Sequence, residues 1–96
     1  MFVVGETPVA LFKLQGDFFA LDNRCPHAGA SLVHGTVEEG VVRCRIHHWG
    51  FCIREGRYVD EDRPEFDART IPVRVVGDQV QVAIDGGDRT TLGSNR

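Results

Sequence analysis

The sequence predicts an all-β domain built from antiparallel sheets. Apolar and polar residues alternate along residues 70–76 and again along 79–84, which is the period of a half-buried strand. Turns that contain glycine separate the short apolar runs elsewhere, as they do in β-hairpins. No long stretch combines a helical period with capping residues. Together these features favour a small β-protein.

The expected strands are short, and most neighbours are joined by tight turns. They cover residues 8–14, 18–21, 41–43, 51–54, 57–59, 70–76 and 79–84. One face of the last pair is predicted to be apolar, and it is formed by Val73, Val75, Val80, Val82 and Ile84. Arg74, Gln79 and Gln81 fall on the opposite face.

The length of the chain limits it to one domain. With 96 residues it buries only about 60–65% of its unfolded surface, so we expect a thin core. Small folds often gain stability from a metal or from disulfides. We expect the domain to cover residues 1–85, followed by a flexible tail over 86–96, where Gly, Ser and Thr are frequent.

Composition and charge argue against several classes of function. The net charge is −3, whereas nucleic-acid binding needs a basic surface, so we expect no nucleic-acid partner. No apolar run approaches the ~18 residues that span a bilayer, and the first residues do not resemble a signal peptide. We therefore expect no membrane partner and a cytoplasmic location. The odd number of cysteines, three, favours metal ligation over a disulfide framework.

Two short motifs each combine a cysteine with a histidine. Cys25 is followed by Pro26 and His27, and after 16 further residues Cys44 is followed by Arg-Ile and His47. Each motif lies between expected strands, so two loops can converge on one site from a rigid sheet. Thiolate and imidazole ligands together suit zinc or an iron–sulfur cluster.

The order of the ligands favours a cluster over zinc. A zinc knuckle usually brings two thiolates at a spacing of two to four residues, and a second knuckle brings the histidines. Here each motif mixes one cysteine with one histidine, which fits two adjacent irons that take two sulfurs and two nitrogens respectively. A structural zinc site in an interaction module stays open as an alternative.

These residues resemble the Rieske family, whose signature is C-x-H followed by C-x-x-H. Cys25-Pro-His-Ala-Gly-Ala-Ser-Leu32 is similar to its first cluster loop, and Cys44-Arg-Ile-His-His-Trp-Gly-Phe51 to its second. Phe19-Ala-Leu-Asp-Asn23 and Ile71-Pro-Val-Arg-Val75 are similar to segments of small Rieske ferredoxins, so the resemblance covers about residues 8–84. It implies the Rieske iron–sulfur fold, with two cluster-binding loops at one end and a cluster-binding subdomain over about 24–52.

The resemblance also implies the cofactor and its surroundings. One [2Fe-2S] cluster per chain would be bound by Cys25, His27, Cys44 and His47. The residues expected around it are Pro26, Gly29, His48, Trp49 and Gly50. The family usually has glycine where this chain has His48, which suggests either a positive φ at that residue or a close approach of its backbone to the cluster. His48 is also a conceivable alternative ligand, although the C-x-x-H spacing favours His47.

Four positions predict a cluster of low potential. High-potential members of the family carry a disulfide between the loops, and Ala30 and Ile46 occupy those two places here. High-potential members also place hydroxyl groups near the cluster, where this chain has Trp49 and Phe51. Hydrogen bonds to cluster sulfur raise the potential, so losing them is expected to lower it.

The function implied is that of a small soluble electron carrier. It would take electrons from a flavin-dependent NAD(P)H ferredoxin reductase and pass them singly to a terminal oxygenase, without being an enzyme itself. The alternative is a small Rieske-like subunit of a larger reductase, such as nitrite reductase. Ferredoxins of this kind generally have another strand before the segment that matches residues 2–5, so the edge at 8–14 is expected to be exposed.

Three further features carry weaker expectations. The acidic segment 60–67 is read as a solvated loop, with a docking patch for a basic partner as the alternative. Cys52 is read as a small buried hydrophobic residue, or as a surface thiol. His34 is expected to be exposed.

Overall fold

The structure is a computed structural model that describes residues 2–26, 29–46, 48–83 and 89–94. Within these residues the strands form three antiparallel sheets. The central sheet has the order β1-β2-β3-β7, formed by Phe2–Val4, Thr7–Leu14, Asp17–Asp22 and Thr70–Ile71. A second sheet consists of β4, β5 and β6, which are Thr36–Glu38, Val41–Arg43 and Gly50–Cys52. The third consists of β8, β9 and β10, which are Val73–Val76, Gln79–Ala83 and Arg89–Ser94. The all-β prediction is therefore confirmed.

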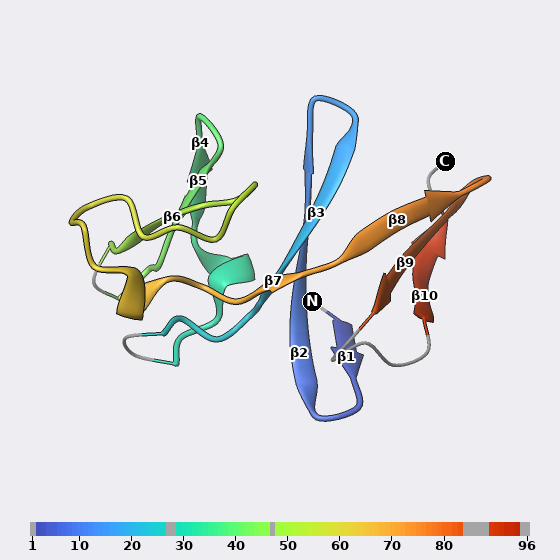
Figure 1. The fold of residues 1–96 in the computed structure, drawn as a ribbon, viewed down its shortest axis with the longest axis horizontal. Coiled ribbons are helices and arrows are strands. Elements are labelled where there is room, and N and C mark those ends of the chain that lie inside the picture. Colours follow the sequence, from blue (N-terminus) through green and yellow to red (C-terminus); the bar gives the residue numbers. More distant parts are fainter. Residues whose placement is uncertain (1, 27–28, 47, 84–88, 95–96) are drawn as a thin grey trace.

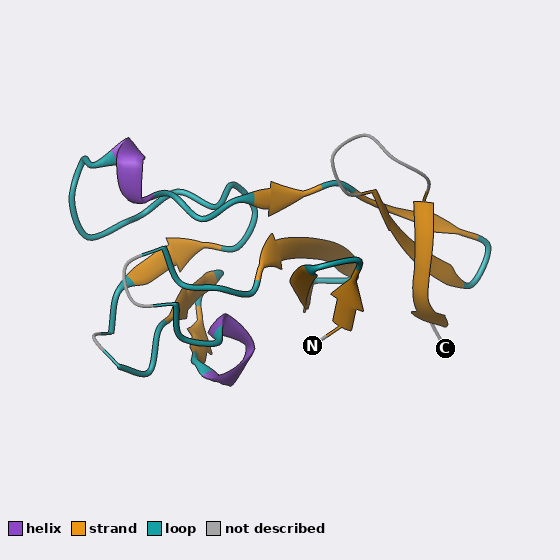
Figure 2. Cartoon of the chain, turned by 90° about the horizontal axis from the view of Figure 1, so that it is seen from below, coloured by secondary structure: helices purple, strands orange, loops and turns teal. Residues whose placement is uncertain are grey.

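The central sheet separates two apolar cores. In β2, Ala10 and Phe12 point to one side and Val9 and Leu11 to the other, as the two-residue period of a strand requires. The larger core joins the first side to β5, β6 and the loops around them, and the smaller one joins the second side to β8 and β9. Figures 1 and 2 accordingly show β4–β6 and β8–β10 at opposite ends of the molecule, with the central sheet between them.

Two-residue turns close the β2–β3 and β4–β5 hairpins. Gln15 and Gly16 have φ of 51° and 89°, and Glu39 and Gly40 have φ of 52° and 79°. Positive φ at both central residues defines the type I′ turn, whose twist matches that of the flanking strands. The turn between the strands over 8–14 and 18–21 was expected, whereas β4, and with it the second hairpin, was not among the expected strands. Two single-turn 3₁₀ helices, η1 (Leu32–His34) and η2 (Pro64–Phe66), lie in the longer connections.

Several expected strands are shorter or interrupted. The strand predicted over 70–76 divides into β7 and β8 at Pro72, which has no N–H to donate to a ladder. The strand predicted over 51–54 is β6, which begins at Gly50 and ends at Cys52. The strand predicted over 57–59 is reduced to an isolated bridge between Phe51 and Tyr58.

The pairing of β8 with β9 confirms the predicted apolar face. Val73 lies opposite Val82 and Val75 opposite Val80, while Arg74 lies opposite Gln81 and donates to its side chain over 3.2 Å. Val80 and Val82 are buried, but Val75 is 44% exposed because β8 extends beyond the central sheet (Figure 1). Ile84 lies outside the described residues.

Both ends of the chain differ from expectation. The flexible tail predicted over 86–96 is wrong for Arg89–Ser94, which form β10 and pair with β9. Leu92 packs against the smaller core, and threonine favours strands, so this segment extends the sheet. At the other end, Phe2–Val4 form β1 and cover the edge of β2 along Thr7–Val9. No helix within the described ranges is long and apolar enough to cross a membrane.

The buried face of β9 gives a test of the smaller core. Val82 is 0% exposed, so Val82→Ala is expected to lower the free energy of unfolding by about 2 kcal/mol, from lost burial and a residual cavity. Val75→Ala removes the same atoms from an exposed place and is expected to change stability by less than about 0.5 kcal/mol. Urea denaturation of both variants measures the difference. Equal effects would show that β8 and β9 do not pack on the central sheet as described.

Candidate metal centre

The two cysteine motifs lie on two loops at the same end of the molecule, beyond β3 and between β5 and β6 (Figure 1). The first loop begins at Cys25, three residues after β3 ends at Asp22, and the second begins at Cys44, directly after β5. Strands of two different sheets thus carry them. Cys25 and Cys44 both belong to the larger core, which joins these sheets.

The two loops share one hydrogen-bond pattern. Cys25 donates its N–H to the carbonyl of Ala30 over 2.8 Å, and Gly29 donates to the carbonyl of Cys25 over 2.8 Å. In the second loop Cys44 donates to Trp49 over 2.9 Å, and His48 donates to Cys44 over 2.8 Å. Gly29 and His48 therefore occupy equivalent places, four residues after their cysteines.

Both of these residues have left-handed backbone conformations. Gly29 has φ of 70° and His48 has φ of 59°. The positive φ that was predicted for His48 is thus confirmed. An L-residue in this conformation costs roughly 1–2 kcal/mol, which glycine avoids. The exposed side chain of His48 does not lie among the core residues that surround Cys44.

The two thiols are buried at equivalent positions. Cys25 is 2% exposed and Cys44 is 0% exposed, and neither forms a disulfide. Their chemistry fits a thiolate-ligated cluster. The two predicted imidazole ligands, His27 and His47, lie outside the described residues. Among the residues that are described, no three His, Cys, Asp or Glu side chains form a potential metal site.

Asn23 anchors the first loop. Its side chain donates to Ser31 Oγ over 2.7 Å and accepts the N–H of Val33 over 2.8 Å, and the residue is only 3% exposed. Its backbone N–H donates to Pro8, and its carbonyl accepts the N–H of Leu32. Asn23 therefore closes the base of the loop from within. No local sequence pattern indicates this role of Asn23, because its partners lie up to fifteen positions away.

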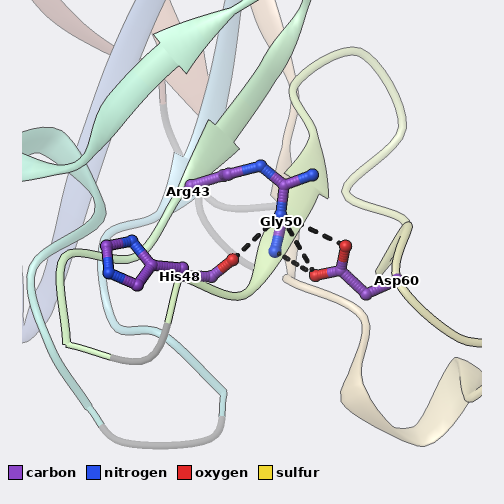
Figure 3. Close-up of polar contacts among 4 residues, drawn as sticks. All are labelled: Arg43, His48, Gly50 and Asp60. Atoms are coloured by element: carbon purple, nitrogen blue, oxygen red, sulfur yellow. Dashed lines mark hydrogen bonds and ion pairs between the residues drawn. The ribbon is translucent and has the colours of Figure 1, made fainter.

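Arg43 and Asp60 anchor the second loop, and Figure 3 shows how they meet around it. Arg43 Nη1 donates to the His48 carbonyl over 2.9 Å and to Asp60 Oδ1 over 3.1 Å. Asp60 Oδ2 also accepts the N–H of Gly50 over 2.9 Å. Gly50 is buried, and a Cβ there would lie 3.0 Å from Arg43 Nη1, so glycine leaves room for the guanidinium group. Neither Arg43 nor Asp60 was identified from the sequence.

An aromatic cluster supports the second loop from the side. Trp49 stacks on Tyr58 with ring centroids 4.6 Å apart and meets the edge of Phe66 at 5.1 Å. Trp49 thus packs against aromatic side chains of the segment that follows β6. Burial raises the pKa of Tyr58, and the nearby carboxylates of Glu61 and Asp60 raise it further.

The acidic segment 60–67 is only partly a solvated loop. Asp60 binds the second loop, and Asp67 accepts the N–H of Tyr58 over 2.9 Å. Phe66 packs against the larger core, while Glu61 and Asp62 remain exposed. The reading as a simple solvated loop was wrong for the two carboxylates at its ends, which hold backbone groups.

The other residues singled out from the sequence lie in several environments. Pro26 is exposed on the first loop, and His34 is exposed as expected. Ile46 is 57% exposed, whereas Phe51 is fully buried. Cys52 is half-buried and outside both cores, so it is less buried than predicted.

Asp22 and Arg24 form an ion pair beside the first loop. The carboxylate of Asp22 accepts Arg24 Nε over 2.9 Å and Nη2 over 2.7 Å, and it also accepts the backbone N–H of Arg24. The hydrogen bond from the Arg24 guanidinium holds the pKa of Asp22 below its usual value, although burial opposes this. The pair links the end of β3 to the residue before Cys25.

The fold and the paired loops define a small antiparallel β-protein with two buried cysteines on matching loops at one end. The model of the Rieske [2Fe-2S] domain matches residues 1–72. The chain belongs to the Rieske [2Fe-2S] family, which confirms the resemblance seen in the motifs.

Relatives and solved structures agree with this family. The ferredoxin component of biphenyl 2,3-dioxygenase from Rhodococcus jostii (strain RHA1) is 36% identical over 90 residues, which cover 93% of this chain and 82% of that protein. The ferredoxin of carbazole 1,9a-dioxygenase from Nocardioides aromaticivorans IC177 superposes with a TM-score of 0.77 at 27% identity, covering 85% of this chain and 80% of that one. A chain in the complex of reduced oxygenase and oxidized ferredoxin in carbazole 1,9a-dioxygenase gives a TM-score of 0.76 at 28% identity, with 84% and 82% covered.

The equivalence of Gly29 and His48 predicts opposite effects of substitution. A Cβ at Gly29 would meet no atom within 4 Å, so Gly29→Ala should lose about 1 kcal/mol of stability from backbone conformation alone. His48→Gly should instead leave stability unchanged or raise it by up to about 1 kcal/mol. Thermal unfolding of the two variants measures this, and a large loss for His48→Gly would contradict the assignment.

The Asp22–Arg24 pair predicts a dependence of stability on pH. The pKa of Asp22 is lower in the folded state than in the unfolded state, so its ionised carboxylate stabilises the fold. This stabilisation is fully present above the unfolded pKa of about 3.9 and is lost as pH falls through the folded pKa. Asp22→Asn is therefore expected to destabilise the protein at pH 7 and to do so less at about pH 2. Urea unfolding at both pH values measures the change, with the exposed Asp17→Asn as control. If the difference in free energy of unfolding between the wild type and Asp22→Asn were the same at both pH values, the ionised carboxylate of Asp22 would not stabilise the fold.

Proposed function

We propose that this chain is a one-electron carrier that binds one Rieske [2Fe-2S] cluster through Cys25, His27, Cys44 and His47. The observation that carries the proposal is the pair of buried cysteines on loops with matching hydrogen bonds, in a chain of the Rieske family. When bound, the cluster supplies a single reversible electron step. The membership of this family favours the cluster over a structural zinc ion.

The protein's own residues have three tasks in this function. The backbone bonds within each loop fix the cysteines, and the larger core keeps water from their sulfur atoms. Trp49 covers the second loop through its packing on Tyr58 and Phe66. The exposed Pro26 and Ile46 lie on the two loops, so a partner that approaches this end meets a partly apolar surface.

The proposed partners are a flavin-dependent NAD(P)H ferredoxin reductase and a terminal oxygenase. The support is that similar chains are ferredoxin components of dioxygenase systems, one of them seen in a complex with its oxygenase. We propose that the chain acts in the cytoplasm and has no substrate site of its own. In support, the Rieske domain accounts for residues 1–72, and the described residues beyond it form β8–β10, which pack on the central sheet.

Spectroscopy of the reduced protein tests the cofactor and its potential. After reduction with dithionite, EPR is expected to show the low average g value of a cluster with mixed histidine and cysteine ligands. The midpoint should fall toward the low end of the Rieske range of about −150 to +300 mV, because Phe51 and Trp49 supply no hydroxyl. A colourless protein that contains zinc would refute the proposal, and a midpoint above about +100 mV would refute the low potential.

Substitution of the histidines tests the ligand assignment. His27→Cys and His47→Cys are each expected to lower the midpoint, because a thiolate leaves the cluster more negative than a neutral imidazole does. His48→Cys serves as the control, since its neighbour His47 is the proposed ligand. If the His48 variant shifts the midpoint and the His47 variant does not, the ligand is His48.

A further inference from the structure

Arg43 reaches across the second loop from the strand that leads into it. It is the last residue of β5 and directly precedes Cys44, yet its Nη1 donates to the carbonyl of His48, five residues further on. The same nitrogen lies 3.1 Å from Asp60 Oδ1 and 3.3 Å from Oδ2. One guanidinium nitrogen thus joins the loop to the acidic segment (Figure 3).

This contact fixes the peptide group between His48 and Trp49. The group is planar and trans, so when its carbonyl points to Arg43 its N–H must point to the opposite side of the loop. Asp60 holds the next N–H along the chain, that of Gly50, over 2.9 Å. Arg43 and Asp60 therefore restrain the backbone on both sides of Trp49, in the loop that carries Cys44 and His47.

In the first loop the described side-chain anchor is Asn23, which binds Ser31 and Val33 at the base of the loop and not the left-handed Gly29. Arg24 directly precedes Cys25 as Arg43 precedes Cys44, but its guanidinium binds back to Asp22. Glycine is the left-handed residue there, whereas the second loop has histidine. The contacts from Arg43 and Asp60 thus occur in the second loop, where the left-handed residue is His48. A residue other than glycine adopts that conformation only at an energetic cost.

We propose that Arg43 and Asp60 are positioning residues of the iron–sulfur centre, which hold His48 in its left-handed conformation and thereby keep the second ligand loop in the geometry that the cluster needs. The inference rests on the proposed cofactor. It assigns to Arg43 and Asp60 a role that acts through the backbone and involves no contact with the cluster.

The first experiment compares Arg43→Gln with Arg24→Gln. Both remove one positive charge directly before a ligand cysteine, so the direct effect of charge on the cluster is matched. Arg43→Gln is expected to release the cluster about tenfold faster, followed by visible absorbance, and to broaden the EPR lines of the reduced protein. Arg24→Gln is expected to stay within twofold of the wild type, with unchanged line widths. Equal behaviour of the two variants would overturn the proposal.

A second pair of variants separates positioning from general stability. Arg43→Gln combined with His48→Gly should recover the wild-type rate of release and line widths, because glycine adopts the conformation without the restraint. Arg43→Lys should retain most of the restraint on the loop and release the cluster at close to the wild-type rate, since a single nitrogen of Arg43 makes the three described bonds. Failure of His48→Gly to restore the Arg43→Gln protein would overturn the proposal, even if that variant alone cannot be loaded.

The wild-type protein distinguishes this inference from the proposed function. If it shows no Rieske EPR signal, the proposed function fails, and the inference fails with it. If it shows the signal and the Arg43 and Arg24 variants behave alike, only the inference fails.

Discussion

The proposed metal centre depends on a backbone constraint that occurs twice. Each cysteine begins a loop that closes on itself four and five residues later, and the closure requires a left-handed residue. Because the loop bonds are backbone bonds, they fix the cysteine whatever side chains surround it. The first loop meets the requirement with Gly29, and the second meets it with His48 and two side chains that hold the strained peptide.

The central sheet connects the end of the molecule that carries the two cysteine loops to the rest of the fold. Its two faces carry separate cores, and Cys25 and Cys44 belong to the larger one, together with Leu21 and Phe51. A thin domain would gain from having the proposed ligands in the core, because a metal bound there would also join the two sheets. The smaller core lies on the opposite face of the central sheet, where β8–β10 pack at the far end of the molecule from the loops (Figure 2).

Local patterns predicted much of this structure, and contacts distant in the sequence account for the rest. The tight β2–β3 turn, the two cysteine loops between strands and the positive φ of His48 follow from residues within a few positions of each other. The anchors Asn23 and Asp60 bind partners up to fifteen and seventeen positions away, which no local pattern reveals. Strand β10 was missed because its polar residues and the glycines in and before it indicate a loop, whereas the open edge of β9 supplies the pairing.

The magnitudes explain why histidine is tolerated in place of glycine. The left-handed conformation costs His48 roughly 1–2 kcal/mol of folding stability. Glycine would avoid this cost, but it would make the unfolded chain more flexible, which lowers stability by about 0.4–1 kcal/mol. The net difference is therefore small. Arg43 and Asp60 are 44% and 35% exposed, so their ion pair alone contributes little. Their bonds to the backbone of His48 and Gly50 are charge-assisted, however, and such bonds are stronger than neutral ones. Because histidine and glycine at position 48 differ so little in stability, these two bonds are enough to hold the loop with histidine there. The ion pair between Arg43 and Asp60 serves mainly to orient the two side chains toward the backbone groups that they bind.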